Sequence, residues 1–527
     1  MPSGLCSHDK PAMEKIIMQW RQLLSTKRSG NEEEIRARAD LRSEFEKDYH
    51  KIISSASFRR LQDKTQVFPL DKSDFIRTRL THSLEVSSVG RSLAQNISER
   101  IIDMRIDPDF TLETERAITE VIECAGLIHD IGNPPFGHFG EEAIREWFVK
   151  HLPRLQMGGK PVTDILTEQE LNDFLHFEGN AQGLRLVSKL HFAENGCGMN
   201  LTYSLLSTMI KYPRSSTSMN PGSSLISDRK MGFFKSEEEL FSRIQHVTGT
   251  NGKRNPLTFI LEAADDIAYA TADIEDAFKK GFFDYPTFTA ELWKRKVSKD
   301  YIEELDEIYS RAAQGRSEKK STQKPKKNNA HWGELGSYMD SLKGSGYTTA
   351  FGGNVHDMGM SGEYVSPGEY ALMTWLSEMQ SVLLLAAAES FVENYTAIMD
   401  GRYDRELICD SKEAVLLNAL ESIAYDYAFT SMSIYKTEIA ANNILTYLLN
   451  KLVPSVLQYD RETPPGLMEE KFLSLISENY KQIYAWSVRG KTDEEKLYYR
   501  LLLATDSISG MTDSYARDLY TDLNGIT

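Results

Sequence analysis

The stretch AGLIHDIGNPPFGHFGEEA, residues 125–143, sets the fold expected for this chain. Residues 113–128 contain strong helix formers, with acidic residues in the first turn and apolar residues toward the end. Gly132 and the two prolines that follow Asn133 prevent this helix from continuing. We therefore expect the histidine and aspartate at positions 129 and 130 to lie at a helix end, where they face a rigid turn.

A second helix is predicted near His82, because apolar residues follow it at spacings of three and four. A single histidine at such a position is more often a core side chain than a ligand. Arg79 lies three positions earlier, so a cation and a metal ligand can share one helix face and both point toward an anion. The apolar positions of that face are Val86, Val89, Leu93, Ile97 and Ile101.

A third helix, rich in alanine, is predicted over residues 259–278. Asp265, Tyr269 and Asp273 are spaced by four and therefore form one stripe on it. A helix that only packs on a core would carry apolar residues in such a stripe. Two acids and an aromatic residue in line indicate the wall of a pocket instead.

Four side chains on these segments form a ligand set for a metal ion: His82, His129, Asp130 and Asp265. Two imidazoles and two carboxylates bind a divalent cation without thiolates. Open coordination positions would let the ion activate water or bind phosphate oxygens. The set favours a metal-dependent phosphohydrolase.

Six segments of the chain resemble, in order, the signatures of one known family, the bacterial deoxyguanosine triphosphate triphosphohydrolases of the HD superfamily. The segments are FRRLQDKTQVFPL (58–70), RTRLTHSLEV (77–86), GLIHDIGNPPFGHFGEEA (126–143), FEGNAQGLRLV (177–187), EAADDIAYATADIEDA (262–277) and GMTDSYARDLY (510–520). The resemblance implies that the four ligands hold Mn²⁺ or Mg²⁺ beside the α-phosphate. It also implies cleavage between the 5′ oxygen and the α-phosphorus, which releases a deoxynucleoside and inorganic triphosphate.

The resemblance assigns further roles. The fourth ligand is Asp265 and not Asp266, because Asp265 lies in the helical register that also aligns Tyr269 and Asp273. His138 corresponds to the catalytic histidine of the family, and Glu141, three residues later, would orient and charge its imidazole. From the residues alone, His138 is equally well explained as the cap of the following helix.

The substrate contacts implied by the family fall on both sides of the metal ligands. Tyr269 corresponds to the ring that packs against the deoxyribose, and Asp273 to the carboxylate that accepts the 3′-hydroxyl. Taken singly, each cation among the remaining positions is more simply a solvated surface residue. The residues that correspond to sugar, base and phosphate contacts are Gln66, Val67, Arg79, Asn180, Lys211 and Lys230.

Composition sets outer limits that agree with a soluble enzyme. The chain has 527 residues, 41% of them hydrophobic, and four widely spaced cysteines without a CxxC pattern. The most apolar run, residues 382–388, is too short to span a bilayer, so we expect a cytoplasmic protein with no membrane partner. The net charge of −16 repels a polyanionic substrate, so binding must depend on the metal and on local cations. Those cations are Arg59, Arg60, Lys64, Arg77 and Arg79.

Long stretches without strand alternation predict an all-α protein with an HD core, a packed C-terminal helical lobe and few short hairpins, one of them near residues 67–75. The expected segments are an N-terminal helical segment (1–54), the HD core (55–280), an insertion (281–366) and the C-terminal lobe (367–527). Residues 311–327 carry seven basic residues against one acidic residue, as in a solvated, mobile loop. The alternative is a contact with single-stranded DNA, which activates some family members, or with other subunits. The family also implies a homo-oligomer, often a hexamer.

Three functions follow from these features. The first is a dNTP triphosphohydrolase that acts on dGTP, with relaxed specificity for several dNTPs left open. The second is another HD phosphohydrolase acting on nucleotides, which the stripe of Tyr269 and Asp273 disfavours. The third is a catalytically silent nucleotide or single-stranded-DNA-binding regulator, which the intact ligand set with His138 and Glu141 disfavours.

Overall fold

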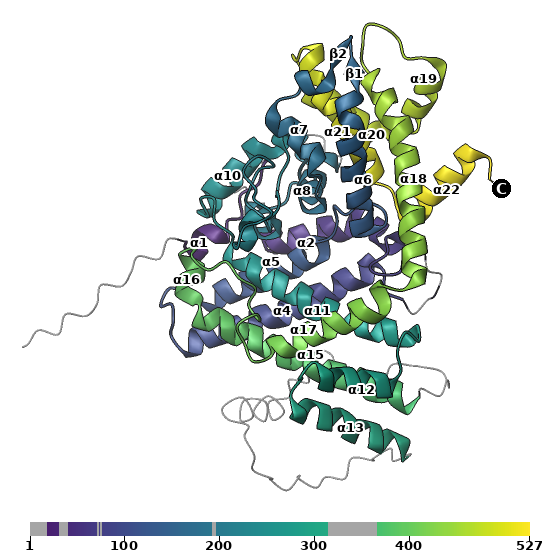
Figure 1. Cartoon of the computed structure of the whole chain (residues 1–527). Coiled ribbons are helices and arrows are strands. Elements are labelled where there is room, and N and C mark those ends of the chain that lie inside the picture. The colour runs from purple at the N-terminus through teal and green to yellow at the C-terminus, as the bar shows by residue number, and fades with distance from the viewer. Residues whose placement is uncertain are drawn as a thin grey trace, which may run out of the picture.

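The computed structural model describes residues 18–30, 40–70, 73, 76–191, 196–314 and 366–526. Within these ranges the chain consists of helices, connecting loops and one two-stranded sheet, which confirms the predicted all-α class (Figure 1). The basic loop expected over residues 311–327 lies outside the described residues from position 315 onward.

The helices follow one another along nearly the whole described chain. The α-helices are α1 (Trp20–Leu23), α2 (Glu44–Ser54), α3 (Ala56–Arg60), α4 (Arg79–Asp103), α5 (Leu112–Ile128), α6 (Gly137–His151), α7 (Glu168–Leu175), α8 (Gly179–Arg185), α9 (Tyr203–Met209), α10 (Glu238–Thr248), α11 (Pro256–Lys279), α12 (Tyr285–Lys294), α13 (Lys299–Ala313), α15 (Pro367–Glu393), α16 (Tyr395–Met399), α17 (Ala414–Ala424), α18 (Met432–Leu457), α19 (Leu467–Ser474), α20 (Glu478–Ser487), α21 (Asp493–Ser509) and α22 (Asp513–Asn524). Short 3₁₀ turns are η1 (Leu61–Asp63), η2 (Leu152–Arg154), η3 (Val162–Asp164), η5 (Ile226–Asp228) and η6 (Lys235–Glu237), and π-helical turns are η4 (Leu186–Leu190) and η7 (Tyr425–Phe429).

The sheet is a hairpin of β1 (Gln156–Met157) and β2 (Lys160–Pro161), which pair antiparallel. Gly158 and Gly159 form its turn, and both have the positive φ that such a two-residue turn requires. The described residues near positions 67–75 do not form the hairpin expected there. In that region Thr65 and Thr78 form an isolated bridge, and four residues between 71 and 75 lie outside the described ranges.

Helices α4 and α5 pack against each other at unusually short range, which brings their two histidines together. All five apolar residues predicted for one face of α4 are buried. Gly126 of α5 faces the backbone of Ser87 on α4, where a Cβ would lie 2.6 Å from the Ser87 Cα. Gly90 of α4 is similarly close to Ile122. Glycine at these crossings therefore permits an approach that a side chain would prevent.

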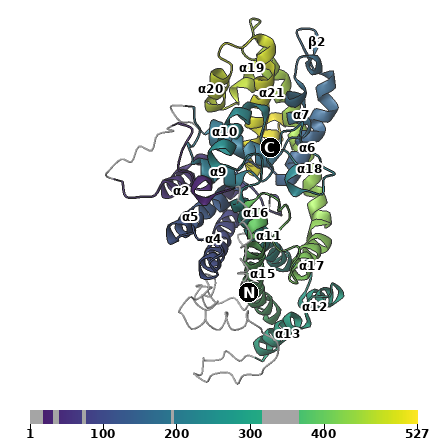
Figure 2. The ribbon, with the colours of Figure 1, turned by 90° about the vertical axis from the view of Figure 1, so that its left-hand side faces the viewer.

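Helix α11 completes the core around these two helices. It packs on α4, α5, α9, α15 and α17, and its buried face continues into the large apolar cluster of α12, α13 and α15. Figure 2 shows α12 and α13 at the end of the molecule opposite α19 and α20. The central position of α11 fixes where its carboxylates lie relative to α4 and α5.

A second apolar cluster lies beside the first and is built from both halves of the chain. Its members include Phe148 of α6 and Phe174 of α7, together with Leu448 of α18 and Leu501 of α21. Helix α18 runs along α6 and also contacts α19, α21 and α22 (Figure 1). The C-terminal helices therefore pack directly on α6, the helix that follows the HD dipeptide.

Helix α15 is long and apolar enough, with a mean hydropathy of 1.3, to cross a membrane by composition alone. Its apolar side chains instead pack within the protein, against α4, α11 and α13. Trp375 is fully buried and donates a hydrogen bond from its indole nitrogen to the Tyr301 carbonyl over 2.7 Å. These contacts are those of a helix in a protein core.

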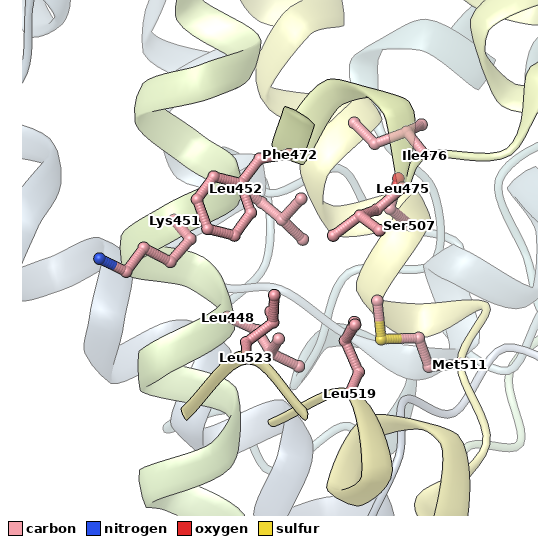
Figure 3. A pocket seen from close by; sticks show the side chains of 10 residues that line it. All are labelled: Leu448, Lys451, Leu452, Phe472, Leu475, Ile476, Ser507, Met511, Leu519 and Leu523. Atoms are coloured by element: carbon pink, nitrogen blue, oxygen red, sulfur yellow. The ribbon is translucent and has the colours of Figure 1, made fainter. Parts of the chain in front are cut away.

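An apolar pocket lies between α18, α19, α21 and α22 (Figure 3). Its walls are mainly leucine side chains, and Lys451 at its edge directs its ammonium group away from them. None of the residues that line it is among the predicted site residues. The pocket is therefore separate from the site described next.

Candidate metal and phosphate site

The structure brings the four predicted ligands together from three helices. His82 lies in the first turns of α4, His129 and Asp130 follow α5, and Asp265 lies in α11. The Nε2 atoms of His82 and His129 lie 3.1 Å and 3.4 Å from Oδ1 of Asp265. One ligand atom from each of His82, His129 and Asp130 lies within 4.8 Å of the other two. The adjacent Asp266 makes no contact with this group among the ion pairs of the described residues.

The donor atoms suit a divalent cation. Nδ1 of His129 hydrogen-bonds to the Gly126 carbonyl over 2.8 Å, an arrangement that leaves its Nε2 to face the two carboxylates. That Nε2 atom and Nδ1 of His82 are buried and have no hydrogen-bond partner. Burial alone would lower the pKa of His129, but the charges of Asp265 and Asp130 raise it above its ordinary value. Two imidazoles beside two carboxylates therefore fit the ligand chemistry of a divalent metal ion.

Two cations lie next to the carboxylates of this group. Arg79 is buried and hydrogen-bonds to Asp130, whose other oxygen accepts from Nδ2 of Asn133 over 2.9 Å. Nζ of Lys211 lies 3.1 Å from Oδ2 of Asp265. Gly137 has a positive φ and leaves room for the guanidinium, since a Cβ there would lie 2.4 Å from Nη2 of Arg79. Both cations are therefore placed where a phosphate beside the carboxylates would meet them.

The stripe on α11 forms one wall of the site. The Tyr269 ring packs edge-on to His82, with 6.4 Å between ring centroids, and its hydroxyl hydrogen-bonds to Asp273. Burial raises the pKa of Asp273 well above its ordinary value. Oδ2 of Asp273 and Oε1 of Gln66 are buried without a hydrogen-bond partner, whereas Val67 belongs to the apolar core. Unpartnered buried polar atoms are rare in folded proteins, and a bound ligand, ion or water is one explanation for them.

His138 and Glu141 form a pair on the first turn of α6. Nδ1 of His138 lies 3.2 Å from Oε2 of Glu141, and the hydrogen bond and charge of Glu141 raise the pKa of His138. The His138 side chain is 78% exposed, whereas that of Glu141 is 2% exposed. Oε1 of Glu141 accepts a hydrogen bond from the Gly179 backbone over 2.9 Å. The imidazole is thus open to solvent on one side and held by a buried carboxylate on the other.

Two predicted phosphate donors make a different contact in this structure. Nζ of Lys230 and Nδ2 of Asn180 both lie within hydrogen-bond distance of Oε1 of Glu178, at 2.9 Å and 3.1 Å. Glu178 is buried and also lies 3.7 Å from the guanidinium of Arg145. Lys230 and Asn180 therefore lie beside the His138–Glu141 pair and not beside the four ligands.

Most side chains of the predicted cluster of local cations contact other groups of the protein in this structure. Arg77 pairs with three carboxylates, those of Glu85, Glu275 and Asp276. The backbone carbonyls of Ser54 and Gly510 accept hydrogen bonds from Arg59 and Arg60. Only Arg79 of that cluster contacts one of the four ligands. Among the described residues, Arg79 and Lys211 are the arginine and lysine side chains that form ion pairs with the carboxylates of the four ligands.

The C-terminal segment holds the turn after the HD dipeptide. The carboxylate of Asp513 accepts hydrogen bonds from the backbone nitrogens of Phe136 and Thr65, at 2.8 Å and 3.0 Å. Nζ of the buried Lys64 donates to the carbonyls of Asn133 and Ser509. Burial lowers the pKa of Lys64 to about 7. The geometry of the turn therefore depends on residues near the C-terminus.

Four residues that contact the site were not predicted from the sequence. Asn133 and Glu178 lie inside the quoted motifs, and Arg145 lies one helical turn after Glu141, so their positions offered a signal. Phe429, whose ring is parallel to that of Tyr269 with 6.3 Å between centroids, offered none. It lies in the π-helical turn η7, far from every quoted segment.

Comparison with known proteins agrees with this geometry. A family model described as the HD domain matches residues 79–194, which include His82, His129 and Asp130. A protein of Listeria monocytogenes, named deoxyguanosinetriphosphate triphosphohydrolase-like protein, is 41% identical over 514 residues, which cover 97% of this chain and 100% of that protein. A protein of the same name from Synechocystis sp. is 32% identical over 526 residues, covering 97% of this chain and 100% of that protein. The deoxyguanosinetriphosphate triphosphohydrolase of Serratia proteamaculans is 30% identical, covering 92% of this chain and 94% of that protein. The chain therefore belongs to the deoxyguanosinetriphosphate triphosphohydrolase family of HD-domain proteins.

Proposed function

We propose that this protein is a metal-dependent dNTP triphosphohydrolase that acts on dGTP and releases deoxyguanosine and inorganic triphosphate. The observation that carries the proposal is the convergence of His82, His129, Asp130 and Asp265 at distances of 3.1 to 3.6 Å. The names of relatives that match nearly the full chain support the same activity.

The four side chains would hold Mn²⁺ or Mg²⁺. When bound there, the ion would supply positive charge beside an α-phosphate oxygen. Arg79 and Lys211 are placed to pair with the phosphates, and each is now paired with a carboxylate of the site. A triphosphate needs several converging donors, and these two contact different carboxylates of the ligand group. Lys230 would join them by leaving Glu178.

The sugar would lie against α11. The Tyr269 ring would pack where a ribose carries its 2′-hydroxyl, and the unpartnered Oδ2 of Asp273 would accept the 3′-hydroxyl. Gln66 and Val67 would lie beside the sugar and the base, and the unpartnered Oε1 of Gln66 fits such a contact. Asn180 stays a proposed polar donor on the phosphate side.

Hydrolysis requires proton movement at both ends of the bond. The water oxygen adds to the α-phosphorus and the bond to the 5′ oxygen breaks, so one proton leaves the water and one reaches the 5′ oxygen. His138 is solvent-exposed and Glu141 raises the pKa of its imidazole, which suits it to accept or donate a proton in this reaction. Either end of the reaction is compatible with this placement.

The remaining proposals concern the setting of the enzyme. We place it in the cytoplasm, as a homo-oligomer, with a hexamer as the expected form and no membrane partner. Single-stranded DNA is proposed as an effector that would contact the basic residues 311–327. Deletion of residues 315–328 with unchanged DNA binding and assembly would contradict that role.

The test is product analysis. Purified protein is incubated with Mn²⁺ and each of the four dNTPs or GTP, alone and in mixtures, and the products are separated by chromatography and ³¹P NMR. Deoxynucleoside with intact triphosphate is expected, fastest from dGTP. Pyrophosphate or monophosphate would indicate another HD phosphohydrolase, and no turnover would indicate a silent nucleotide or DNA-binding regulator.

A further inference from the structure

Two buried carboxylates lie side by side behind the exposed imidazole of His138. The side chains of Glu141 and Glu178 are 2% and 4% exposed. The guanidinium of Arg145 lies between them, 3.9 Å from Oε2 of Glu141 and 3.7 Å from Oε2 of Glu178. Two carboxylates this deeply buried are costly to ionise unless cations and hydrogen bonds compensate them.

The compensating groups are distributed unequally. Glu141 has the His138 imidazole on Oε2 and the Gly179 backbone on Oε1. Glu178 receives the ammonium of Lys230 and the amide of Asn180 on one oxygen. With a neutral imidazole, the two carboxylates are balanced by two cations, Arg145 and Lys230.

Lys230 is close enough to affect both carboxylates. Burial opposes the charged form of Glu141, but the hydrogen bond from His138 and the charges of His138, Lys230 and Arg145 hold its pKa below the ordinary value. The Lys230 side chain is 41% exposed and has the length and freedom to move between acceptors. In this structure the ammonium donates a hydrogen bond to Glu178 and also lies 5.9 Å from the centroid of the Tyr212 ring.

We propose that, before substrate binds, Glu178 is a positioning residue that holds the Lys230 ammonium and thereby keeps Glu141 available to hydrogen-bond His138. Neither Glu178 nor Arg145 contacts the four ligands among the ion pairs of the described residues. The effect of Glu178 on the reaction would therefore pass through the imidazole. The inference rests on the proposed role of His138 and Glu141 in hydrolysis.

Loss of the Glu178 charge would change the electrostatics around His138. Without the Glu178 charge, Lys230 would pair with Glu141 and compete with His138 for the same carboxylate. The protonated imidazole would lose its stabilising partner, and the pKa of His138 would fall. The other charged groups that act on the imidazole are Arg79 of α4 and Asp130 beyond α5, and neither changes in this comparison.

The exposure of His138 allows a test without substrate or metal. Diethyl pyrocarbonate modifies neutral imidazoles, and mass spectrometry of peptides gives the rate at each histidine. The rate at His138 as a function of pH therefore gives its pKa, with the exposed His50 of α2 as an internal reference for the reagent. Glu178→Gln should lower the pKa of His138 by about one unit. At a pH below the pKa of His138 in both proteins, the variant then has up to about ten times more neutral imidazole, and its modification is up to about tenfold faster.

A double-mutant cycle separates this mechanism from a simple change of charge. If Glu178 holds Lys230, Lys230→Met alone should leave the pKa of His138 nearly unchanged, and Lys230→Met should restore it in the Glu178→Gln background. If the two charges act on the imidazole only through space, their effects should be equal and opposite in either background. Additive shifts would overturn the proposal, as would an unchanged pKa in Glu178→Gln.

Two further variants control the experiment. Glu142→Gln removes an exposed carboxylate from the same turn of α6. The pKa of His138 in this variant should equal, within error, its pKa in the protein without substitutions. Thermal unfolding followed by circular dichroism checks each variant, and Glu178→Ser repeats the cycle if the glutamine variant does not fold. Because no turnover is measured, failure of this cycle is distinct from failure of the proposed hydrolysis, which is decided by the products formed from dGTP.

Discussion

The approach of α8 to the His138–Glu141 pair makes Gly179 the most informative position to change. A Cβ at Gly179 would lie 2.2 Å from Oδ1 of Asn133 and 2.4 Å from Oε1 of Glu141. These two side chains hold Asp130 and His138 respectively. Relief of the overlap requires each to move by about 1 Å, since ordinary contacts begin near 3.4 Å.

The cost of Gly179→Ala follows from these contacts. Loss of the backbone hydrogen bond to the buried Glu141 carboxylate costs about 1.5 to 3 kcal/mol, and overpacking adds about 1 to 3 kcal/mol. We therefore expect a fall of at least about 2.5 kcal/mol in the free energy of unfolding. Displacement of catalytic groups by about 1 Å should lower kcat/KM for dGTP by about 100-fold.

The same helix provides a matched control. Gly183 lies one turn later, and a Cβ there would meet only ordinary contacts, the nearest at 3.6 Å. Gly183→Ala should leave kcat/KM unchanged and raise the free energy of unfolding by up to about 1 kcal/mol, because alanine favours a helix interior. Urea unfolding and steady-state kinetics on both variants are the assay. Equal behaviour of the two variants would refute the reasoning.

Three further changes test other parts of the site. Asp265→Ala should abolish metal-supported turnover and weaken Mn²⁺ binding measured by calorimetry, while Asp266→Ala should spare much of both; the reverse ranking would show that Asp266 is the ligand. Tyr269→Ala should narrow the preference for dGTP over GTP in kcat/KM, and an unchanged ratio would exclude that role for the ring. The pKa of Lys64 is about 7 in the folded protein, whereas its ordinary value is 10.5. Between pH 7 and 10.5 the Lys64 side chain is therefore protonated in the unfolded chain and neutral in the folded protein. Lys64 should therefore make the free energy of unfolding rise with pH across that window, by up to about 1.4 kcal/mol per unit, and Lys64→Met should remove this contribution in urea unfolding. Identical slopes would contradict the assignment.

The local parts of the fold were predictable from the sequence because their causes are local. The acidic first turn and the apolar end of α5 predicted a helix over 113–128, and the structure has it over Leu112–Ile128. Spacing by three and four predicted the buried face of α4 correctly. Spacing by four placed Asp265 and Tyr269 on one face of α11, next to His82.

The remaining contacts were not predictable because they join distant segments without any periodic pattern. Asp513 binds the backbone of Phe136 across 377 positions, and Lys230 binds Glu178 across 52. Arg77 lies in a motif beside Arg79, yet one pairs with carboxylates of α11 and the other with Asp130. Charge type and motif membership are shared by these two arginines, and only the packed structure separates their partners.

The hydrogen bonds that Asp513 accepts from the backbone of Phe136 and Thr65 have a consequence for how the protein is made. The turn after the HD dipeptide lacks the acceptor for its Phe136 amide until residue 513 has been synthesised. A nascent chain that has already formed α4, α5 and α11 would hold the metal-binding side chains without the contact that fixes the neighbouring turn. Proteolysis or premature termination just before α22 would therefore leave a largely folded protein that turns over substrate poorly, even though the lost residues lie outside the HD domain.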